Sequence, residues 1–392
     1  MTRGLHPDIA CDIQTADHSE GNAREQAEKQ AGEDAAPPGV WSKREHKCSL
    51  PLNVTHSSAQ EFVGHGSFFL MDQITVIVLG DPAEPTLKVL DKLGDGVNLT
   101  IAKTADELGD ALAEARVLFN WAGPKGEIRN VLERAPKLEY IHARYAGLDA
   151  LLFPELIASH VPLTNGSGTF SQSLGEFVMA GALYWAKDLP RMLRAKAERR
   201  WEVFNILELS TQTMGIVGHG DIGRAIARRA KAFGMRVLAL RRDPSPRPGD
   251  EDVDRVYATK DLHQMLPECD YVVVAAPLTP DTKHLMSTAE FNCMKPEGII
   301  MNVGRGPVID EAAMTEALRS GRIRGAALDV FEVEPLPADS ALWGMDNVLI
   351  SAHTSDHTKD WLNDAAMFFV EQFGRWRAGE ALKNVVDKRA GY

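Results

Sequence analysis

The sequence has few cysteines and no long apolar run. Its cysteines, Cys11, Cys48, Cys269 and Cys293, form neither a CxxC pair nor a dense framework, which argues against structural zinc and disulfides and favours a reducing compartment. No run approaches the roughly 18 apolar residues of a membrane helix. The amino terminus also lacks the apolar core of a secretory signal, and its early acidic residues are not typical of an organelle transit peptide. We therefore expect a cytoplasmic protein with no membrane segment.

An excess of positive charge is missing as well. The formal net charge of -12 argues against nonspecific nucleic-acid binding, because a polyanion would be repelled on average. The basic run from Arg191 to Arg200 has no aromatic residue beside it except Trp201, which is typical of a solvated helix face or a dimer rim. With 392 residues, of which 44% are hydrophobic and 25% charged, the chain is globular and long enough for two domains.

Residues 1–70 are rich in Ala, Glu, Gln, Ser, Gly and His and have little periodicity. Such a segment buries too little apolar surface to offset its ordering entropy, so we predict a disordered extension. The first apolar strand pattern covers 74–79, and Met71 stands just before it. Met71 is therefore a candidate start of the protein, and the rival interpretation is a regulatory tail.

The stretch 214–242 organises the rest of the chain. An apolar run at 214–217 leads into three glycines with GxGxxG spacing, a helical pattern follows to Phe233, and a second apolar run covers 235–240. In such units the glycines make a tight turn, admit a pyrophosphate and pack the helix on the strand, while the helix N-terminus faces the phosphates. We therefore predict a dinucleotide site rather than an ordinary turn, with His219 exposed in it. Its residues are Gly218, Gly220, Asp221, Ile222 and Gly223.

Strand and helix patterns alternate on both sides of this unit. Strands are predicted at 74–79, 115–119, 138–142, 161–163, 214–217, 235–240, 271–275, 298–303, 325–328 and 348–351, and helices at 104–114, 128–135, 169–200, 222–233 and 359–379. The pattern predicts an α/β fold with two Rossmann-like or flavodoxin-like domains built on doubly wound parallel sheets. A nucleotide-binding domain, 171–353, would be inserted into a split substrate domain, 72–170 plus 354–392, with the substrate in the cleft between them.

Three charged or polar residues follow predicted strands of the nucleotide sheet. Arg305, Glu334 and His353 all fall at the carboxyl edge, where open α/β sheets bind ligands. Behind a dinucleotide turn, an arginine, a carboxylate and a histidine form a set suited to hydride transfer, and the alternative is a buried structural network. His353 and His357 are four residues apart, but no cysteine or HExxH glutamate accompanies them, so we predict no metal site.

Several ordered motifs together resemble one family. The GxGxxG turn, the PLTPDT segment from Pro277 to Thr282, NVGRGPVID, DVFEVEPLP and the late histidine are similar to the D-isomer-specific 2-hydroxyacid dehydrogenases over residues 74–392. The VDKRAGY tail, Asp356 and the paired arginines after the second nucleotide strand resemble the glyoxylate/hydroxypyruvate reductase branch. Ala352 departs from the family, which commonly has proline before the histidine.

The resemblance implies a role for each of these residues. Arg305 would hold a 2-oxo acid with its planar fork, His353 would exchange the proton, and Glu334 would hold that histidine and favour its charged form. Ala146 and Gly147, in RYAGLD, would bind the substrate carboxylate through backbone N–H groups, where glycine permits close approach. Further cofactor contacts are expected at Pro277, Thr282, Val303, Gly304 and Asp329.

The end of the second nucleotide strand bears on the choice of cofactor. NAD-binding folds place an Asp or Glu there for the ribose 2′-OH, whereas this chain has Arg241 and Arg242. Guanidinium groups can bind a 2′-phosphate through charge-assisted hydrogen bonds. We therefore predict NADP(H) as the preferred cofactor, with NAD(H) possible.

These features favour NADPH-dependent reduction of a small 2-oxo acid of the glyoxylate or hydroxypyruvate type. The partners would be that substrate and a second copy of the chain, since the resemblance implies a homodimer formed through 169–209. Two alternatives stay open: a nucleotide-sensing, corepressor-like binding protein of the same fold, and a formate dehydrogenase-like enzyme. Glu334 argues against the second, because those relatives pair the active-site histidine with glutamine.

Overall fold

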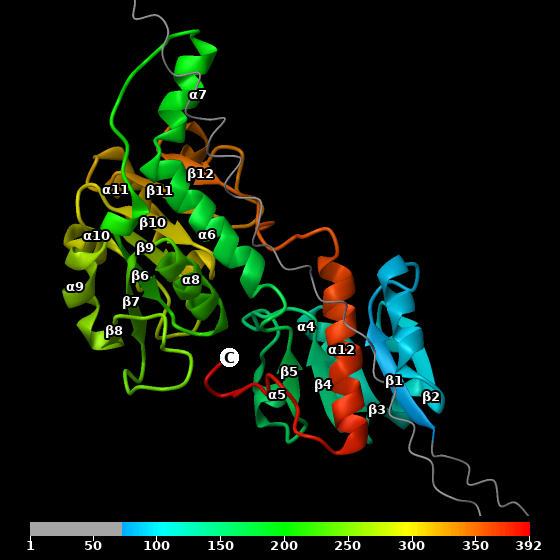
Figure 1. Ribbon diagram of the computed structural model, residues 1–392. Helices are drawn as coiled ribbons and strands as arrows, with labels where there is room; N and C mark the ends of the chain where they lie inside the picture. Colours follow the sequence, from blue (N-terminus) through cyan, green and yellow to red (C-terminus); the bar gives the residue numbers. More distant parts are fainter. Residues whose placement is uncertain (1–72) are drawn as a thin grey trace, which may run out of the picture. The chain divides into compact units, whose positions relative to one another are not determined.

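The computed structural model describes residues 73–392, so the extension predicted at 1–70 lies outside the described residues. Residues 73–392 belong to one compact unit, Phe68–Tyr392. This unit contains two sheets in which every strand pair is parallel, with helices packed on them (Figure 1). The predicted α/β class with two parallel sheets is confirmed.

The first sheet has the strand order β2-β1-β3-β4-β5. Its strands are β1 Ile74–Leu79, β2 Val97–Ala102, β3 Ala115–Asn120, β4 Tyr140–Ala143 and β5 Leu163–Asn165. Every residue of β1 is buried, as expected for a central strand with helices on both faces. The last helix, α12 Trp361–Ala378, packs on this sheet (Figure 1): the Phe369 ring stacks on Phe119 of β3 with 4.1 Å between ring centroids.

The second sheet has the order β12-β11-β10-β9-β6-β7-β8. Its strands are β6 Thr213–Val217, β7 Arg236–Arg241, β8 Arg255–Ala258, β9 Tyr271–Val274, β10 Ile299–Asn302, β11 Gly325–Leu328 and β12 Val348–Ile350. Counted from β6 as the first strand, the six strands from β8 across to β11 follow the 3-2-1-4-5-6 order of nucleotide-binding α/β sheets. The strand order therefore reverses beside β6, the strand that precedes the Gly-rich turn.

The connections between strands are mostly helical. The longer helices are α4 Lys125–Arg134, α6 Ser171–Ala186, α7 Leu189–Ala197, α8 Asp221–Ala232, α11 Glu311–Arg319 and α12. The short α-helices are α2 Ala105–Leu108, α3 Ala111–Glu114, α5 Pro154–Ala158, α9 Leu262–Met265 and α10 Thr288–Cys293. The 3-10 helices are η1 Pro85–Leu93, η2 Leu209–Thr211, η3 Thr259–Asp261, η4 Leu266–Glu268, η5 Gly306–Val308 and η6 Ala341–Gly344.

Two helix predictions were too long. The stretch 169–200 is not one helix, because Asp188 adopts a left-handed backbone with φ 51° and Pro190 lies in the first turn of α7. The stretch 104–114 is divided into α2 and α3 by Gly109, which has φ 53°. A positive φ cannot continue a right-handed helix, so the chain turns at both positions.

Candidate active site

A cleft of about 1170 Å³ lies at the carboxyl edges of the two sheets. It is lined by residues that follow β3, β4, β5, β6, β9, β10, β11 and β12. The structure brings most of the predicted site residues to this cleft: Ala146, Gly147, Gly220, Asp221, Ile222, Pro277, Val303, Gly304, Arg305, Asp329, Glu334 and His353. The predicted site residues that do not line it are Gly218, Gly223, Arg241, Arg242 and Thr282.

The Gly-rich turn has three different requirements for glycine. Gly218 has φ 101°, and a Cβ on it would lie 2.6 Å from the Ala276 nitrogen. A Cβ on Gly223 would lie 2.3 Å from the Gly218 carbonyl oxygen, whereas a Cβ on Gly220 would meet nothing within 4 Å. The first glycine makes the turn, the third packs α8 on β6, and the second leaves open space at the helix N-terminus. These residues fit the phosphates of a dinucleotide.

Thr282 has a different place from the one expected. Its hydroxyl donates to the Pro277 carbonyl at 2.6 Å and accepts from the Thr279 N–H at 2.8 Å. The side chain therefore closes the loop after β9 instead of facing the cleft. Pro277, which this loop holds, does line the cleft.

His353 and Glu334 form a hydrogen-bonded pair in the lining of the cleft. The His353 Nδ1 lies 2.7 Å from a Glu334 carboxylate oxygen, and the other Glu334 oxygen accepts a hydrogen bond from the Phe331 N–H at 2.9 Å. Because Nδ1 is used by Glu334, Nε2 is the ring nitrogen left for a ligand. His353 has φ 54°, a backbone conformation that is costly for a residue with a side chain and that persists only where surrounding contacts enforce it.

Asp329 provides those contacts. It is 1% exposed, and its carboxylate accepts from the Thr354 N–H at 3.0 Å, the Ser355 N–H at 3.1 Å and the Ser355 hydroxyl at 2.5 Å. The backbone of Asp329 also accepts from the His353 N–H at 2.9 Å. Asp329 therefore holds the histidine loop, although the sequence had suggested only a cofactor contact. This anchor fixes the loop even though Ala352 stands in place of the usual proline.

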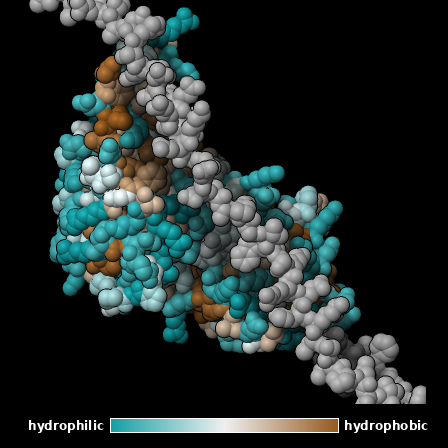
Figure 2. Space-filling view, viewed as in Figure 1, coloured by the Kyte–Doolittle hydropathy of each residue, from teal (hydrophilic) through white to brown (hydrophobic). Residues whose placement is uncertain are grey.

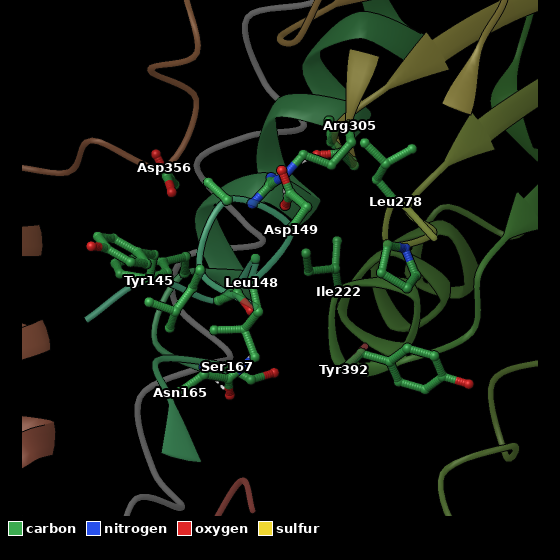
Figure 3. A pocket seen from close by; sticks show the side chains of 18 of the residues that line it. Tyr145, Leu148, Asp149, Asn165, Ser167, Ile222, Leu278, Arg305, Asp356 and Tyr392 are labelled. Atoms are coloured by element: carbon green, nitrogen blue, oxygen red, sulfur yellow. Dashed lines mark hydrogen bonds and ion pairs between the residues drawn. The ribbon is translucent and has the colours of Figure 1, made fainter. Parts of the chain in front are cut away.

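Arg305 reaches from the second sheet to the loop after β4 (Figure 3). Its Nε donates to Asp149 at 2.9 Å and its Nη1 donates to the Gly304 carbonyl at 2.9 Å. A Cβ on Gly147 would lie only 1.4 Å from Arg305 Nη2, so the guanidinium rests directly on the glycine. Within residues 73–392, the N–H groups of Ala146 and Gly147 donate no hydrogen bond. An arginine fork and two free N–H groups therefore lie side by side.

Asp149 was not predicted as a site residue. It belongs to the RYAGLD motif, which had been assigned only to backbone contacts, and its partner Arg305 is 156 positions away in the chain. The sequence did offer one indication of a site residue, since Asp149 is an acidic residue two positions after the proposed carboxylate-binding glycine. Its ion pair holds Arg305 against Gly147.

Arg241 differs from the expectation that both arginines are available to a cofactor. Its side chain is 5% exposed, and its guanidinium donates to the Asp250 carboxylate at 2.8 Å and to the Asp243 carbonyl at 2.7 Å. This guanidinium holds the pKa of Asp250 near 2. Arg241 is thus occupied in closing the loop after β7, whereas the guanidinium carbon of the exposed Arg242 lies 4.6 Å from the Tyr392 ring centroid.

His219 was expected to be exposed, and this prediction was wrong. It is 1% exposed, and its Nδ1 lies 3.3 Å from Asp250 Oδ1 and 3.4 Å from Arg241 Nη1. Burial is the main cause that lowers the pKa of His219 from 6.5 to about 4. The histidine therefore fills the space beneath the turn and supports the Arg241–Asp250 pair from inside.

This burial predicts a pH dependence of stability. Between pH 6.5 and about 4 the unfolded chain binds a proton at His219 and the folded chain does not, so the free energy of unfolding falls as the pH falls through that window. His219→Asn should lessen the slope by at most about 1.4 kcal/mol per pH unit, the value for one proton. The measurement is denaturant unfolding at several pH values from 4.5 to 8. Equal slopes for the two proteins below pH 6.5 would contradict the assignment, and above pH 7 the slopes should agree.

The C-terminal tail connects the two sides of the cleft. The Val386 N–H donates to the Leu163 carbonyl of β5 at 2.9 Å, and the Lys388 ammonium donates to the Val161 carbonyl at 3.0 Å. Tyr392 then lines the cleft beneath Arg242. In Figure 3 the Tyr392 ring lies on the same side of the cleft as Ile222.

Residues 73–392 contain neither a metal-binding cluster nor a membrane-spanning helix. No group of three or more His, Cys, Asp or Glu residues in this part of the chain is arranged to hold a metal ion. None of its helices combines the length and the apolar character needed to cross a membrane.

Comparisons with known proteins agree with this geometry. Residues 179–355 match the family model described as D-isomer specific 2-hydroxyacid dehydrogenase, NAD binding domain. A glyoxylate/hydroxypyruvate reductase B of Enterobacter sp. (strain 638) is 34% identical over 297 residues, which are 73% of this chain and 88% of that protein. A D-3-phosphoglycerate dehydrogenase of Methanocaldococcus jannaschii is 33% identical over 315 residues, covering 79% of this chain but only 59% of its own length.

A solved structure extends the likeness to three dimensions. The D-isomer specific 2-hydroxyacid dehydrogenase of Xanthobacter autotrophicus Py2, in complex with NADPH and MES, has a TM-score of 0.71 and 34% identity over 82% of this chain and all of that one. The dinucleotide turn and these relatives define an NAD(P)-dependent oxidoreductase. More narrowly, the chain belongs to the D-isomer specific 2-hydroxyacid dehydrogenase family, and within it resembles the glyoxylate/hydroxypyruvate reductase branch.

Proposed function

We propose that the protein reduces a small 2-oxo acid of the glyoxylate or hydroxypyruvate type to the D-2-hydroxy acid, with NADPH as the preferred reductant. The observation that carries this proposal is the cleft itself, which collects the His353–Glu334 pair, Arg305 and the open Gly220 turn. The glyoxylate/hydroxypyruvate reductase named above supports the substrate class. The related dehydrogenase solved with NADPH supports the cofactor.

The substrate would be held by groups that have no other partner. The free N–H groups of Ala146 and Gly147 suit a carboxylate, since backbone donors can approach closely where there is no side chain. Arg305 Nη2 makes no hydrogen bond within residues 73–392 and would donate to the 2-oxo oxygen. A charged donor at this oxygen stabilises the negative charge that develops on it during reduction.

The proton would come from His353. NADPH, when bound along the Gly-rich turn, supplies the hydride. His353 Nε2 gives its proton to the 2-oxo oxygen as that oxygen becomes a hydroxyl, while Glu334 holds Nδ1 and keeps the ring oriented. Asp329 fixes the loop that carries the histidine, so the ring is positioned before the substrate arrives.

Support for NADPH over NADH comes from an excess of arginine around the end of β7. Besides Arg242, this region contains Arg247, whose guanidinium donates to the His219 carbonyl at 3.2 Å, and Arg224, which would touch a Cβ on Gly249 at 2.9 Å. The nearby Asp250 is already paired with Arg241. Arg224, Arg242 and Arg247 form no ion pair within residues 73–392, so their N–H donors are available to a 2′-phosphate at this position.

The test of the proposed function is a steady-state assay of NADPH oxidation. Glyoxylate and hydroxypyruvate should each be reduced, and the product should be the D-2-hydroxy acid. Saturable binding of NADPH without turnover of either acid would favour a nucleotide-sensing binding protein instead. Absence of turnover with both NADPH and NADH would overturn the proposal.

We also propose the domain division 72–170 plus 354–392 for the substrate domain and 171–353 for the nucleotide domain. The packing of α12 on the first sheet supports this division, because the stacked rings of Phe119 and Phe369 join the two separate segments of the proposed substrate domain. The cleft then falls where the chain passes twice between the two sheets. The residue roles given above follow this division.

A homodimer is part of the proposal. Large apolar side chains are exposed on α7 and on the segment after it (Figure 2), including Leu193 at 59%, Trp201 at 95% and Val203 at 86%. Such a group usually marks an interface. Light scattering at micromolar concentration should give the mass of two chains, and Trp201→Glu with Val203→Glu should shift it toward one chain. Trp343→Glu, an exposed tryptophan elsewhere, is the matched control. A monomer mass for the native protein would contradict this prediction.

A further inference from the structure

Arg144 lies in the cleft without a role in the proposed reaction. It directly follows β4 and stands two positions before Ala146, the first of the residues proposed to bind the substrate carboxylate. Its side chain is half-buried. A half-buried cation that faces a substrate cleft needs a reason, because burial of an unpaired charge is costly.

Aromatic rings hold the guanidinium of Arg144 in place. Its central carbon lies 4.7 Å from the ring centroid of Trp121, 5.3 Å from that of Trp361 and 5.5 Å from that of Tyr145. We call these four residues the Arg144 cage. The rings come from three separate segments, the ends of β3 and β4 and the start of α12. Cation–π contacts of this kind orient a guanidinium but use none of its N–H donors.

The N–H donors of Arg144 have no acceptor in the described part of the chain. The side chain makes no hydrogen bond there and has no acidic oxygen within 4.0 Å, and its Nε is buried without a partner. Burial lowers the pKa of Arg144, and the charges of Tyr145, Glu84 and Asp356 oppose that effect. Glu84 is itself used by the Thr86 N–H and hydroxyl, at 3.1 and 2.8 Å. The terminal N–H groups are thus left to a ligand.

Asp356 is the residue that would oppose an anion here. It lines the cleft, and Figure 3 places it on the same side as Tyr145. Burial is the main cause that raises the pKa of Asp356, which favours its uncharged form. The His357 Nε2, 3.7 Å from its carboxyl, offers a charge partner as well. Lys125, at the start of α4, adds a second cation to the lining of the cleft. The raised pKa of Asp356 and the nearby His357 therefore lessen the repulsion that Asp356 would exert on an anion bound by Arg144.

We propose that the Arg144 cage binds a second anionic group on the substrate, a carboxylate or a phosphate at the end away from the 2-oxo acid. This inference rests on the proposed reduction of 2-oxo acids and names the substrate class within it. A planar guanidinium fixed between rings presents parallel N–H donors, the arrangement that pairs with carboxylate and phosphate oxygens. Among the 2-oxo acids that the protein reduces, those with an anionic side chain would then be preferred over uncharged acids of similar size.

The experiment compares substrates that differ only in that group. In one pair, 2-oxosuccinate carries a carboxylate where 2-oxobutanoate carries a methyl group. In the other, 3-phosphohydroxypyruvate carries a phosphate on the hydroxyl of hydroxypyruvate. The quantity measured is the ratio of kcat/KM for the anionic member to kcat/KM for the neutral member, with NADPH. Because both values come from one preparation, the ratio is independent of how much of a variant is folded.

In the native protein we expect a ratio above one in at least one pair, and the pair that shows it distinguishes a carboxylate from a phosphate. Arg144→Leu should lower that ratio by about 10-fold to 100-fold, the range expected for a lost hydrogen bond to a charged group, and Arg144→Lys should restore part of it. Lys359→Leu, which removes one exposed positive charge outside the cleft lining, is the matched control and should keep the native ratio.

Failure of this inference can be distinguished from failure of the proposed function. If the native protein reduces glyoxylate and hydroxypyruvate but has a ratio of one or less in both pairs, the proposed function stands and the cage has no such ligand. An equal loss of ratio in Lys359→Leu and Arg144→Leu would also overturn the inference, because it would indicate general attraction by positive charge. If no 2-oxo acid is turned over, the proposed function fails and the inference falls with it.

Discussion

His353→Ala should lower kcat for the reduction of a 2-oxo acid by about two to four orders of magnitude, the usual contribution of a positioned general acid. The variant loses Nε2, the ring nitrogen that stays available to a ligand because Nδ1 is bonded to Glu334, so water would have to supply the proton. The affinity for NADPH, measured by fluorescence titration, should change little, because His353 follows the edge strand β12, four strands away from β6 and the Gly-rich turn. The measurement is steady-state turnover at saturating NADPH and substrate.

A matched control exists in the same chain. His284 forms a similar pair, with its Nε2 2.7 Å from Glu332, but it does not line the cleft. His284→Ala should therefore keep turnover within a few-fold of the native value. Comparable turnover in His353→Ala and His284→Ala would show that His353 is not the proton donor.

Arg242→Ala should lower the preference for NADPH over NADH by about 10-fold to 100-fold, measured as the ratio of kcat/KM for the two cofactors, since it removes a charged hydrogen-bond donor from the 2′-phosphate. The structure favours changing Arg242 alone. Arg241 is buried against Asp250, so its replacement would disturb the loop after β7. A change in cofactor preference could then not be separated from a change in folding.

Arg255→Ala is the control for this experiment, because Arg255 is another exposed arginine of the same sheet that stacks on a tyrosine, 4.3 Å from the Tyr257 ring centroid. Its cofactor ratio should be that of the native protein. A native enzyme that uses NADH as well as NADPH would refute the preference. A retained preference in Arg242→Ala would instead assign the phosphate to Arg224 or Arg247.

The sequence predicted every central strand of both sheets, and the two strands that it missed, β2 and β8, lie at sheet edges. The central strands β1, β6 and β9 are continuous apolar runs because helices cover both of their faces. The missed strands, β2 and β8, pair on one side only, and their residues are mostly partly exposed. β2 does alternate apolar Val97, Leu99 and Ile101 with polar residues, so a half-buried strand could have been predicted there. β8 has only four residues, too few for an alternation to distinguish it from a loop.

The candidate site was predictable to the extent that it depends on topology. Residues directly after parallel strands meet at one edge, so the convergence of Arg305, Glu334 and His353 followed from their positions alone. What each side chain does there depends on partners that are distant in the chain. Asp329 could not be distinguished from a cofactor ligand until its bonds to Ser355 were seen. The pairing of Arg241 with Asp250 was equally hidden, because the loop between them has no regular pattern.

Gly147 shows why surface exposure is a poor guide to which positions tolerate change. The residue is partly exposed in an irregular loop, a setting in which most substitutions are expected to be neutral. A single methyl group there would nevertheless coincide with the Arg305 guanidinium, 1.4 Å away. In a mutational scan, position 147 should therefore reject even alanine while its exposed neighbour Ala150 accepts many residues. A variant library intended to widen the substrate range should keep this glycine fixed and diversify the walls around it.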